Sequence, residues 1–350
     1  MENKYYIFIL ILISFSMSLE ISHKGELISN VKLSDSVSKK LSLLESSFCF
    51  LPTLSILRDV DSYSSFDLEY AFQVKRVFKG STIILSKDNN YRLWLRYLNE
   101  KLEIRIGLQK IIFGPSQILR SLSWFDNYSI KDPTSQTKGV TALRYKYFMN
   151  NSFDFTFWLI KEQSNKFSLG SRINLSSRVG QWAFTYHRQA ENTIVNVTQI
   201  GIANTDSHDR YAIDYRFDGL FGFWFEGVVH DLSNKLLPYG TAGIDYTLNI
   251  FNGIHFLTET MIIENIDKQF YSAFLLSKPI HFLHKVMLIT QIDWNNKNTY
   301  NYFQWNTSFD RLSINYILSI NTQSLVFSNQ IENIYQEYGI GHKIMFIYNY

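Results

Sequence analysis

Segments of about ten residues in which apolar and polar side chains alternate recur along this chain. Side chains on a strand point to opposite faces in turn, so each segment has one apolar face and one mostly polar face. Strands of this length and pattern fit tilted membrane-spanning strands, which can cross hydrocarbon only as a closed barrel because no water there satisfies the backbone. The sequence therefore predicts an all-β, transmembrane, antiparallel up-and-down β-barrel of about 16 to 18 strands. The segments include residues 91–98, 102–109, 153–159, 211–217, 221–226 and 244–249.

The apolar faces of these segments are rich in Phe, Tyr, Leu and Ile. Three tryptophans break the alternation by falling on the polar face, namely Trp94, Trp158 and Trp224. From Leu102 onward we count about sixteen strands, and residues 65–75 and 91–98 bring the total to about eighteen, an even number that places both ends of the barrel in the periplasm. Residues 19–64 are harder to interpret. They are either the first strands or a segment that covers the periplasmic end, ahead of a single barrel that spans residues 65–350.

The N-terminal 18 residues have the pattern of a secretory signal peptide. Lys4 precedes an apolar run, and Ser16-Met17-Ser18 gives a small-x-small cleavage pattern. The alternative is an uncleaved anchor, although the run is short for spanning a bilayer. Cys49 is the only cysteine, so no intramolecular disulfide forms, and it lies too far from the signal segment to carry a lipid anchor.

The composition narrows the class of protein. Aromatic residues make up 16% of the chain, with 22 Tyr and 28 Phe, yet beyond the N-terminal segment no apolar run approaches the roughly 18 residues of a membrane helix. The aromatic rings must then face lipid or fill the core of a soluble β-protein. A net charge of +3 argues against a nucleic-acid-binding protein.

The chain ends on a strand with one aromatic and aliphatic face, made by Ile344, Phe346, Tyr348 and Tyr350. This ending resembles the C-terminal strand of Gram-negative outer-membrane barrels. The resemblance implies that the barrel assembly machinery reads this strand, and that it closes the sheet by pairing with the first strand.

One connection is much longer than the others and spans residues 114–138. Gly114-Pro115 ends the preceding strand, and Asp132-Pro133 is a second turn signal. Between them lie side chains too apolar for a freely solvated loop: Ile118, Leu119, Leu122, Trp124 and Phe125. We expect this loop to fold inward against the barrel wall and narrow the lumen.

The same region resembles a group of Gram-negative outer-membrane porin-like barrels. In those proteins an Arg-x-Gly-x-Gln strand leads to Phe-Gly-Pro, Leu-Arg, Trp-Phe-Asp, Asp-Pro and Gly-Val. The resemblance implies an outer-membrane channel for passive diffusion of small hydrophilic solutes or ions, and often a homotrimer, although no oligomer-forming face stands out. The matching residues are Arg105, Gly107, Gln109, Phe113 to Pro115, Leu119, Arg120, Trp124 to Asp126, Asp132, Pro133, Gly139 and Val140.

Charged residues on the predicted inner face are unevenly placed, which predicts a mainly basic wall opposite a mainly acidic one. Such a field would favour small polar or charged solutes, whereas the alternative is mutual pairing of these charges. Basic candidates for lining the pore are Arg92, Arg96, Lys146 and Arg172, and acidic ones are Asp214, Glu226, Asp245, Glu259 and Asp293. We expect Arg120 and Asp126 to form the constriction by reaching opposite walls, with Arg105, Asp132 and Arg144 as further candidates.

No catalytic or cofactor-binding pattern stands out. The eight histidines show no zinc-binding motif, no Gly-x-Ser-x-Gly accompanies the His230-Asp231 pair, and no Gly-rich phosphate loop occurs. We therefore predict a protein that is not an enzyme and that needs no metal or cofactor. Two alternatives to a channel remain: a non-conducting barrel acting as a surface adhesin or scaffold, and a secreted soluble β-protein.

Overall fold

A computed structural model of the chain describes residues 19–35, 42–190, 193–197, 200–205, 207–232, 235–250, 252–265, 267–321 and 338–350. The predicted signal peptide, residues 1–18, lies outside this part. No helix that is long and apolar enough to cross a membrane occurs among the described residues.

The described residues form twenty strands joined by turns and irregular segments. They are β1 (Leu19–Asp35), β2 (Ser42–Asp59), β3 (Ser65–Lys79), β4 (Thr82–Leu98), β5 (Leu102–Gln109), β6 (Val140–Asn150), β7 (Phe153–Lys161), β8 (Phe167–Ser177), β9 (Gly180–Gln189), β10 (Thr193–Val197), β11 (Ile200–Thr205), β12 (His208–Asp218), β13 (Gly222–Asp231), β14 (Leu236–Leu248), β15 (Ile254–Glu264), β16 (Lys268–His281), β17 (His284–Asp293), β18 (Asn298–Ser308), β19 (Leu312–Asn321) and β20 (Tyr338–Asn349).

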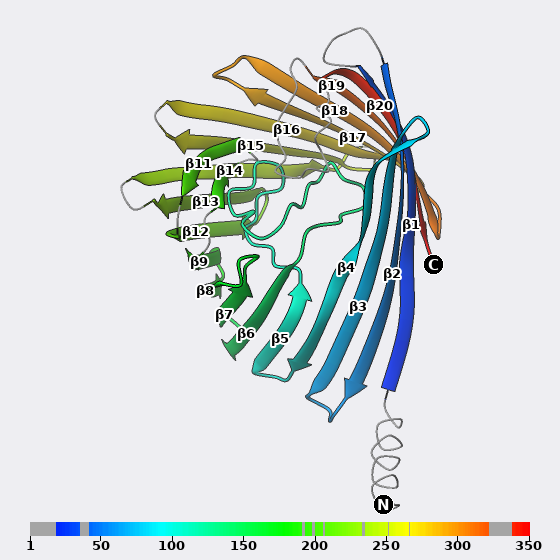
Figure 1. The fold of residues 1–350 in the computed structure, drawn as a ribbon. Coiled ribbons are helices and arrows are strands. Elements are labelled where there is room, and N and C mark those ends of the chain that lie inside the picture. Colours follow the sequence, from blue (N-terminus) through cyan, green and yellow to red (C-terminus); the bar gives the residue numbers. More distant parts are fainter. Residues whose placement is uncertain are drawn as a thin grey trace, which may run out of the picture.

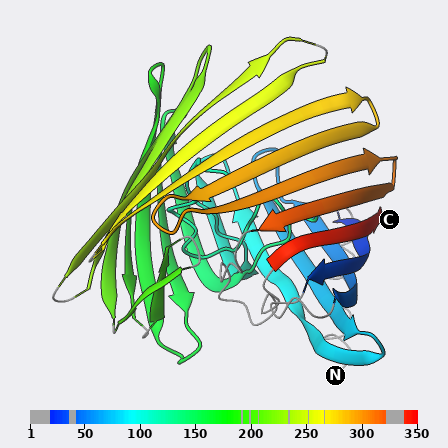
Figure 2. The same ribbon diagram turned by 90° about the horizontal axis from the view of Figure 1, so that it is seen from above.

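Eighteen of these strands close into one antiparallel barrel, as the sequence predicts. Each strand pairs with the next along the chain, β9 pairs with β12, and β20 pairs with β1 to complete the circuit (Figures 1 and 2). The two remaining strands, β10 and β11, form a separate hairpin between β9 and β12. Closure leaves no open sheet edge around the barrel, which is the condition for spanning hydrocarbon with strands.

The total matches the predicted count, but the strands are distributed differently. From Leu102 onward the described residues contain sixteen strands, β5 to β20, but two of these, β10 and β11, lie outside the barrel. The barrel instead gains β1 and β2, which the predicted total did not include. These two strands occupy most of residues 19–64 and are full members of the sheet. Alternation alone cannot separate a hairpin outside the barrel from a wall strand, because it indicates a strand and not the sheet in which that strand pairs.

The alternation places apolar side chains outside and the polar face inside. The outward-facing side chains of Ile106 and Phe223 are 55% and 41% exposed. Gln109 and Glu226, each three residues further along and facing inward, are 0% and 2% exposed. Trp158 and Trp224, the exceptions in the sequence pattern, point inward and are both fully buried. The outer face thus has the apolar surface that lipid requires.

Aromatic rings cluster on the outer face of neighbouring strands near the tight turns. Trp182 of β9 lies 4.4 Å from Tyr215 of β12, measured between ring centroids, and 5.7 Å from Phe225 of β13. Such clusters are typical of the aromatic girdle at a membrane interface, where a ring has an apolar body and a polar edge.

The final residue completes the seam between β1 and β20. Gly25 and Tyr350 exchange two backbone hydrogen bonds of 3.2 and 3.1 Å, and the Tyr350 ring stacks on Phe50 with a centroid distance of 6.3 Å. A Cβ atom on Gly25 would lie only 2.4 Å from the Tyr350 hydroxyl oxygen. The absence of a side chain at Gly25 therefore leaves room for the Tyr350 ring to lie against the barrel wall.

Replacing Gly25 with Ala is expected to weaken this seam, because the methyl group displaces the Tyr350 ring. The clash is with the outer end of a side chain that is 39% exposed and can move aside, so the cost should be about 1 kcal/mol, the low end for overpacking. The temperature at which the folded band disappears on a heat-modifiability gel should fall. Gly227→Ala is the matched control, since its added Cβ meets nothing closer than Ile213 Cγ2 at 3.5 Å. Equal melting of the two variants would contradict this account of the seam.

Candidate functional site

The segment between β5 and β6 leaves the wall and folds into the barrel, as predicted for the inserted loop (Figure 1). We call residues 110–139 the inserted loop. β5 is only 8 residues long, whereas β1 to β4 are 15 to 18 residues long, so the chain turns inward before reaching the height of its neighbours. The loop thereby brings backbone and side chains into the lumen at a fixed level.

Apolar side chains of the inserted loop pack against the inner wall. Leu119 and Leu122 are 4% and 1% exposed and join a cluster that includes Met261 and Ile263 of β15. Phe125, at 8% exposed, joins a second cluster with Trp158. The inner wall is therefore partly apolar beside β6 and β7 as well as beside β12 to β19, and burial there stabilises the loop by roughly 1.5–3 kcal/mol per large side chain.

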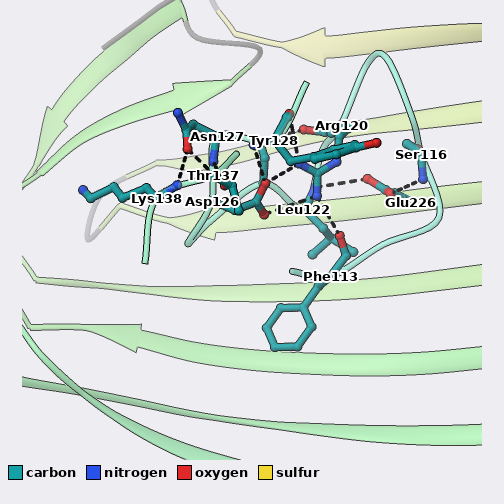
Figure 3. A network of polar contacts seen from close by, with 11 residues as sticks. Phe113, Ser116, Arg120, Leu122, Asp126, Asn127, Tyr128, Thr137, Lys138 and Glu226 are labelled. Atoms are coloured by element: carbon teal, nitrogen blue, oxygen red, sulfur yellow. Dashed lines mark hydrogen bonds and ion pairs between the residues drawn. The ribbon is translucent and has the colours of Figure 1, made fainter. Parts of the chain in front are cut away.

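Two carboxylates on the wall hold the loop by its backbone. Glu259 accepts hydrogen bonds from the amides of Gln117, Ile118 and Leu119 at 2.7, 2.9 and 2.6 Å. Glu226 accepts from Ser116 at 2.8 Å and from Leu122 at 3.0 Å (Figure 3).

These bonds satisfy amides that a buried loop would otherwise leave without partners. Both carboxylates, predicted to line the pore, lie behind the loop with 1% and 2% exposure for Glu259 and Glu226. Gly114 is part of the same arrangement, because its φ is +82° and an added Cβ would lie 2.2 Å from Glu226 Oε1.

Arg120 and Asp126 bind each other, and this corrects the expectation that they reach opposite walls. The Arg120 guanidinium forms a bidentate pair with the Asp126 carboxylate, and the two side chains are 5% and 0% exposed (Figure 3). Arg120 also donates to the carbonyl oxygens of Phe113 and Tyr128, both at 3.4 Å. The pair braces the loop internally instead of extending across the lumen.

The second half of the loop is held by turn contacts. Asp132, a predicted constriction residue, accepts hydrogen bonds from the Thr134 amide and hydroxyl at 2.9 and 2.8 Å. Asn127 and Thr137 bond each other through two contacts of 2.9 and 3.0 Å, which tie the two limbs together (Figure 3). Asp132 is thus a turn-forming residue in this arrangement.

Three arginines lie side by side on β4, β5 and β6. Arg105 is the cross-strand partner of both Arg96 and Arg144. The Glu103 carboxylate lies 2.6 Å from Arg144 and 3.2 Å from Arg105, Arg96 pairs with Asp67, and the Arg105 guanidinium lies 4.4 Å from the centroid of the Trp94 ring.

We call Arg96, Arg105 and Arg144 the arginine row. Their side chains are 27%, 16% and 18% exposed, so they keep contact with the lumen. Lys146 extends the row along β6, 27% exposed and 3.3 Å from Asp154. Asp67 and Glu103 were not among the predicted site residues. Asp67 lies directly opposite Arg96 on the neighbouring strand, and cross-strand pairing of opposite charges is the signal that identifies it.

The other predicted basic residues have different partners. Arg92, 6% exposed, donates to the carbonyl oxygen of Thr137 at 2.8 Å and so holds the end of the loop. Partial burial and the nearby Arg92 guanidinium lower the pKa of Lys110 at the start of the loop. Arg172 forms a bidentate pair with Asp214 at 2.7 and 2.9 Å.

The remaining predicted acidic residues do not gather at the constriction. Asp293 accepts from the amides of Asn295 and Asn296, both at 3.1 Å, and so forms the turn after β17. Asp245 lies 3.6 Å from His255 Nε2. Asp214 pairs with Arg172, whereas Glu226 and Glu259 accept hydrogen bonds from backbone amides of the loop. Neither a continuous acidic wall nor mutual pairing of charges therefore describes the whole set.

No group of three or more metal-binding side chains occurs in the described part of the chain. His230 bonds His208 and Tyr239, at 3.2 and 2.9 Å, and Asp231 is exposed. Among the described residues this histidine is therefore not arranged as a base beside a serine nucleophile and an acid.

No family model matches this sequence, and no curated protein matches it significantly. The structure is similar to OmpF of Salmonella typhi in complex with daunomycin, with a TM-score of 0.53, 10% identity, and coverage of 94% of this chain and 97% of that chain. It is similar to a triple mutant of the Rh. blastica porin, with a TM-score of 0.52, 10% identity, and coverage of 95% and 100%.

OmpT, an outer membrane protein of Vibrio cholerae, gives a TM-score of 0.52 at 10% identity, covering 96% of this chain and 98% of that chain. Identities this low establish shared architecture only. Together with the eighteen-stranded closed sheet, they show that this chain has the porin-like β-barrel fold of Gram-negative outer-membrane proteins.

Proposed function

We propose that the protein is an outer-membrane channel through which small hydrophilic solutes or ions diffuse passively. The observation that carries the proposal is the inserted loop, which lies inside a closed barrel and is fixed to one wall by five backbone hydrogen bonds to Glu226 and Glu259. A loop fixed in this way narrows the lumen to a defined width. A flexible loop would instead obstruct the lumen irregularly.

The arginine row supports a preference for anions. Its guanidinium groups keep partial exposure, while the carboxylates Asp214, Glu226 and Glu259 are 6%, 2% and 1% exposed. The partners of the row, Asp67 and Glu103, are 13% and 12% exposed, so three guanidinium groups stand beside two carboxylates. A permeating solute therefore meets a net positive charge at the row, and groups of charged side chains of this kind select ions in pores. We place the protein in the outer membrane after cleavage of residues 1–18, with membrane lipid and the barrel assembly machinery as partners. Assembly as a homotrimer stays a prediction.

Planar-bilayer recording of the refolded protein tests the proposal. We expect reproducible conductance steps, and in a salt gradient a reversal potential shifted towards the anion. A protein that inserts but gives no steps would contradict channel function and favour a non-conducting surface barrel. A protein found wholly in the soluble periplasm would exclude the membrane barrel.

Replacing both Arg105 and Arg144 with Ala is expected to move the reversal potential towards the cation, because two guanidinium groups are lost from the lumen face. Arg188→Ala is the control, since this side chain is 58% exposed on the outer face and should leave selectivity unchanged. Identical reversal potentials in wild type and double variant would remove the arginine row from the solute path.

A further inference from the structure

Trp94 differs from the other two tryptophans that the strand pattern places on the inner face. Trp158 and Trp224 are fully buried, whereas Trp94 of β4 stays partly exposed. Its cross-strand neighbour on β5 is Gly107, which has no side chain to cover it. Its neighbour on β3 is Glu69, whose carboxylate accepts a hydrogen bond of 3.3 Å from the Trp94 indole. The indole is therefore held at one edge, while part of the side chain stays open to the lumen.

The Trp94 ring supports a member of the arginine row. The Arg105 guanidinium lies over this ring, 4.4 Å from its centroid, and Arg96 lies 5.9 Å from the same centroid. A guanidinium is planar and stacks on aromatic rings. The face of Arg105 towards Trp94 is covered, so the 16% of this side chain that is exposed lies away from the indole. A second planar group can stack there, with Arg105 between two rings.

The guanidinium groups beside this place have hydrogen-bonding capacity left over. Arg144 is the direct cross-strand neighbour of Arg105, and the Glu103 carboxylate contacts a terminal nitrogen of each. Their Nε atoms have no hydrogen-bond acceptor among the described residues. A donor left without an acceptor costs free energy, which a ligand that brings an acceptor recovers. Carboxylate oxygens suit a guanidinium best, because they match its fork of donors.

The carboxylates in this part of the wall are already engaged. Asp67 pairs with Arg96, and Glu103 bridges the other two members of the arginine row. Glu69 is bonded to the Trp94 indole and lies within electrostatic reach of Arg92. With Arg92 counted, four arginines stand beside these three carboxylates. An added anion therefore meets a net positive charge.

We propose that Trp94 and the arginine row form a site for aromatic carboxylates, a class of solute that joins one negative charge to a planar ring. The ring stacks on Arg105, which Trp94 supports from behind, and the carboxylate accepts hydrogen bonds from Arg144. Trp94 is a positioning residue, because it acts through Arg105. The inference rests on the proposed channel function and narrows it to one class of organic anion, since an aliphatic carboxylate gains the ionic contact but not the stack.

Isothermal titration calorimetry of the full refolded barrel in detergent micelles tests this without requiring conductance. The probes are benzoate and cyclohexanecarboxylate, which have the same charge and similar size, but only benzoate has an aromatic ring. With the heat of partition into empty micelles subtracted, we expect benzoate to bind about fivefold more tightly at neutral pH, a ratio typical of one stacking contact.

Three variants separate the stack from the ionic contact. In Trp94→Leu the ratio of the two affinities should fall to about twofold or less, and Trp94→Phe should keep most of it. Arg105→Lys keeps the positive charge but loses the planar group, so benzoate should still bind but without its advantage. Trp305→Leu is the matched control, because this tryptophan is 47% exposed on the outer face, and it should keep the wild-type ratio.

Equal affinity of the wild-type barrel for the two probes would overturn the inference, as would binding of neither. A preference for benzoate that persists in both Trp94→Leu and Arg105→Lys would do the same, because it would place the ring elsewhere. None of these results touches the channel proposal, which fails only if the inserted barrel gives no conductance steps. A silent barrel that still prefers benzoate would keep the site and remove the channel.

Discussion

Replacing Glu259 with Ala is expected to release the inserted loop from the wall. The substitution removes the acceptor for three consecutive loop amides and for the Trp224 indole, which donates at 3.3 Å. Hydrogen bonds to a charged group are worth about 1.5–3 kcal/mol each, so docking of the loop should weaken by about 3 kcal/mol or more. Single-channel recordings should then show a noisy open level in place of one steady conductance.

Glu264→Ala is the matched control for this substitution. Glu264 lies at the end of the same strand, and its side chain is 50% exposed and paired with the exposed Lys268. Surface pairs of this kind contribute little, so the open level should stay steady. Equal noise in both variants would show that the barrel has been disturbed generally. A quiet recording from Glu259→Ala would show that the Glu226 bonds and apolar packing are sufficient to hold the loop.

Replacing Arg120 with Ala is the second change with a large expected effect. It leaves the Asp126 carboxylate buried, with 0% side-chain exposure and no cationic partner. Removing one partner of a buried ion pair typically costs about 3–5 kcal/mol. We therefore expect the free energy of unfolding of the loop and the surrounding barrel to fall by about that amount. The temperature at which heat-modifiable gel mobility is lost measures this change.

The double variant Arg120→Ala with Asp126→Asn should recover most of the lost stability, because the uncompensated charge is then gone. This recovery separates a bracing role from direct contact with solute. A single variant that keeps full stability but shifts ion selectivity would instead place Arg120 in the solute path, as the sequence suggested.

The fold could be predicted from the sequence because period-2 alternation is a local signal. Ile106 and Phe223 face outward in the structure as the alternation requires. The apolar residues of the inserted loop could be placed inward because burying a side chain such as Leu122 is favourable, and this too can be judged from the sequence alone.

The partners of the site residues could not be predicted in the same way. Glu226 bonds Ser116 across 110 positions of the chain, and Glu259 bonds Gln117 across 142. Such contacts depend on where the loop comes to rest in three dimensions, and strand alternation shows only that a carboxylate points inward. The same limit explains why Arg120 was expected to reach across the lumen although its partner, Asp126, is six positions away.

The carboxylate anchors recognise the main chain of the loop and not its side chains. Residues 117 and 118 donate through amides that every amino acid except proline has, while their own side chains stay partly exposed. Ile118 also packs against the apolar clusters of the wall, so its side chain contributes to the attachment. Substitutions at Gln117 can alter the chemistry of the lumen while the amide of residue 117 keeps its bond to Glu259. Natural or engineered variants could therefore change the permeability of the barrel at this position while the conformation of the loop stays the same.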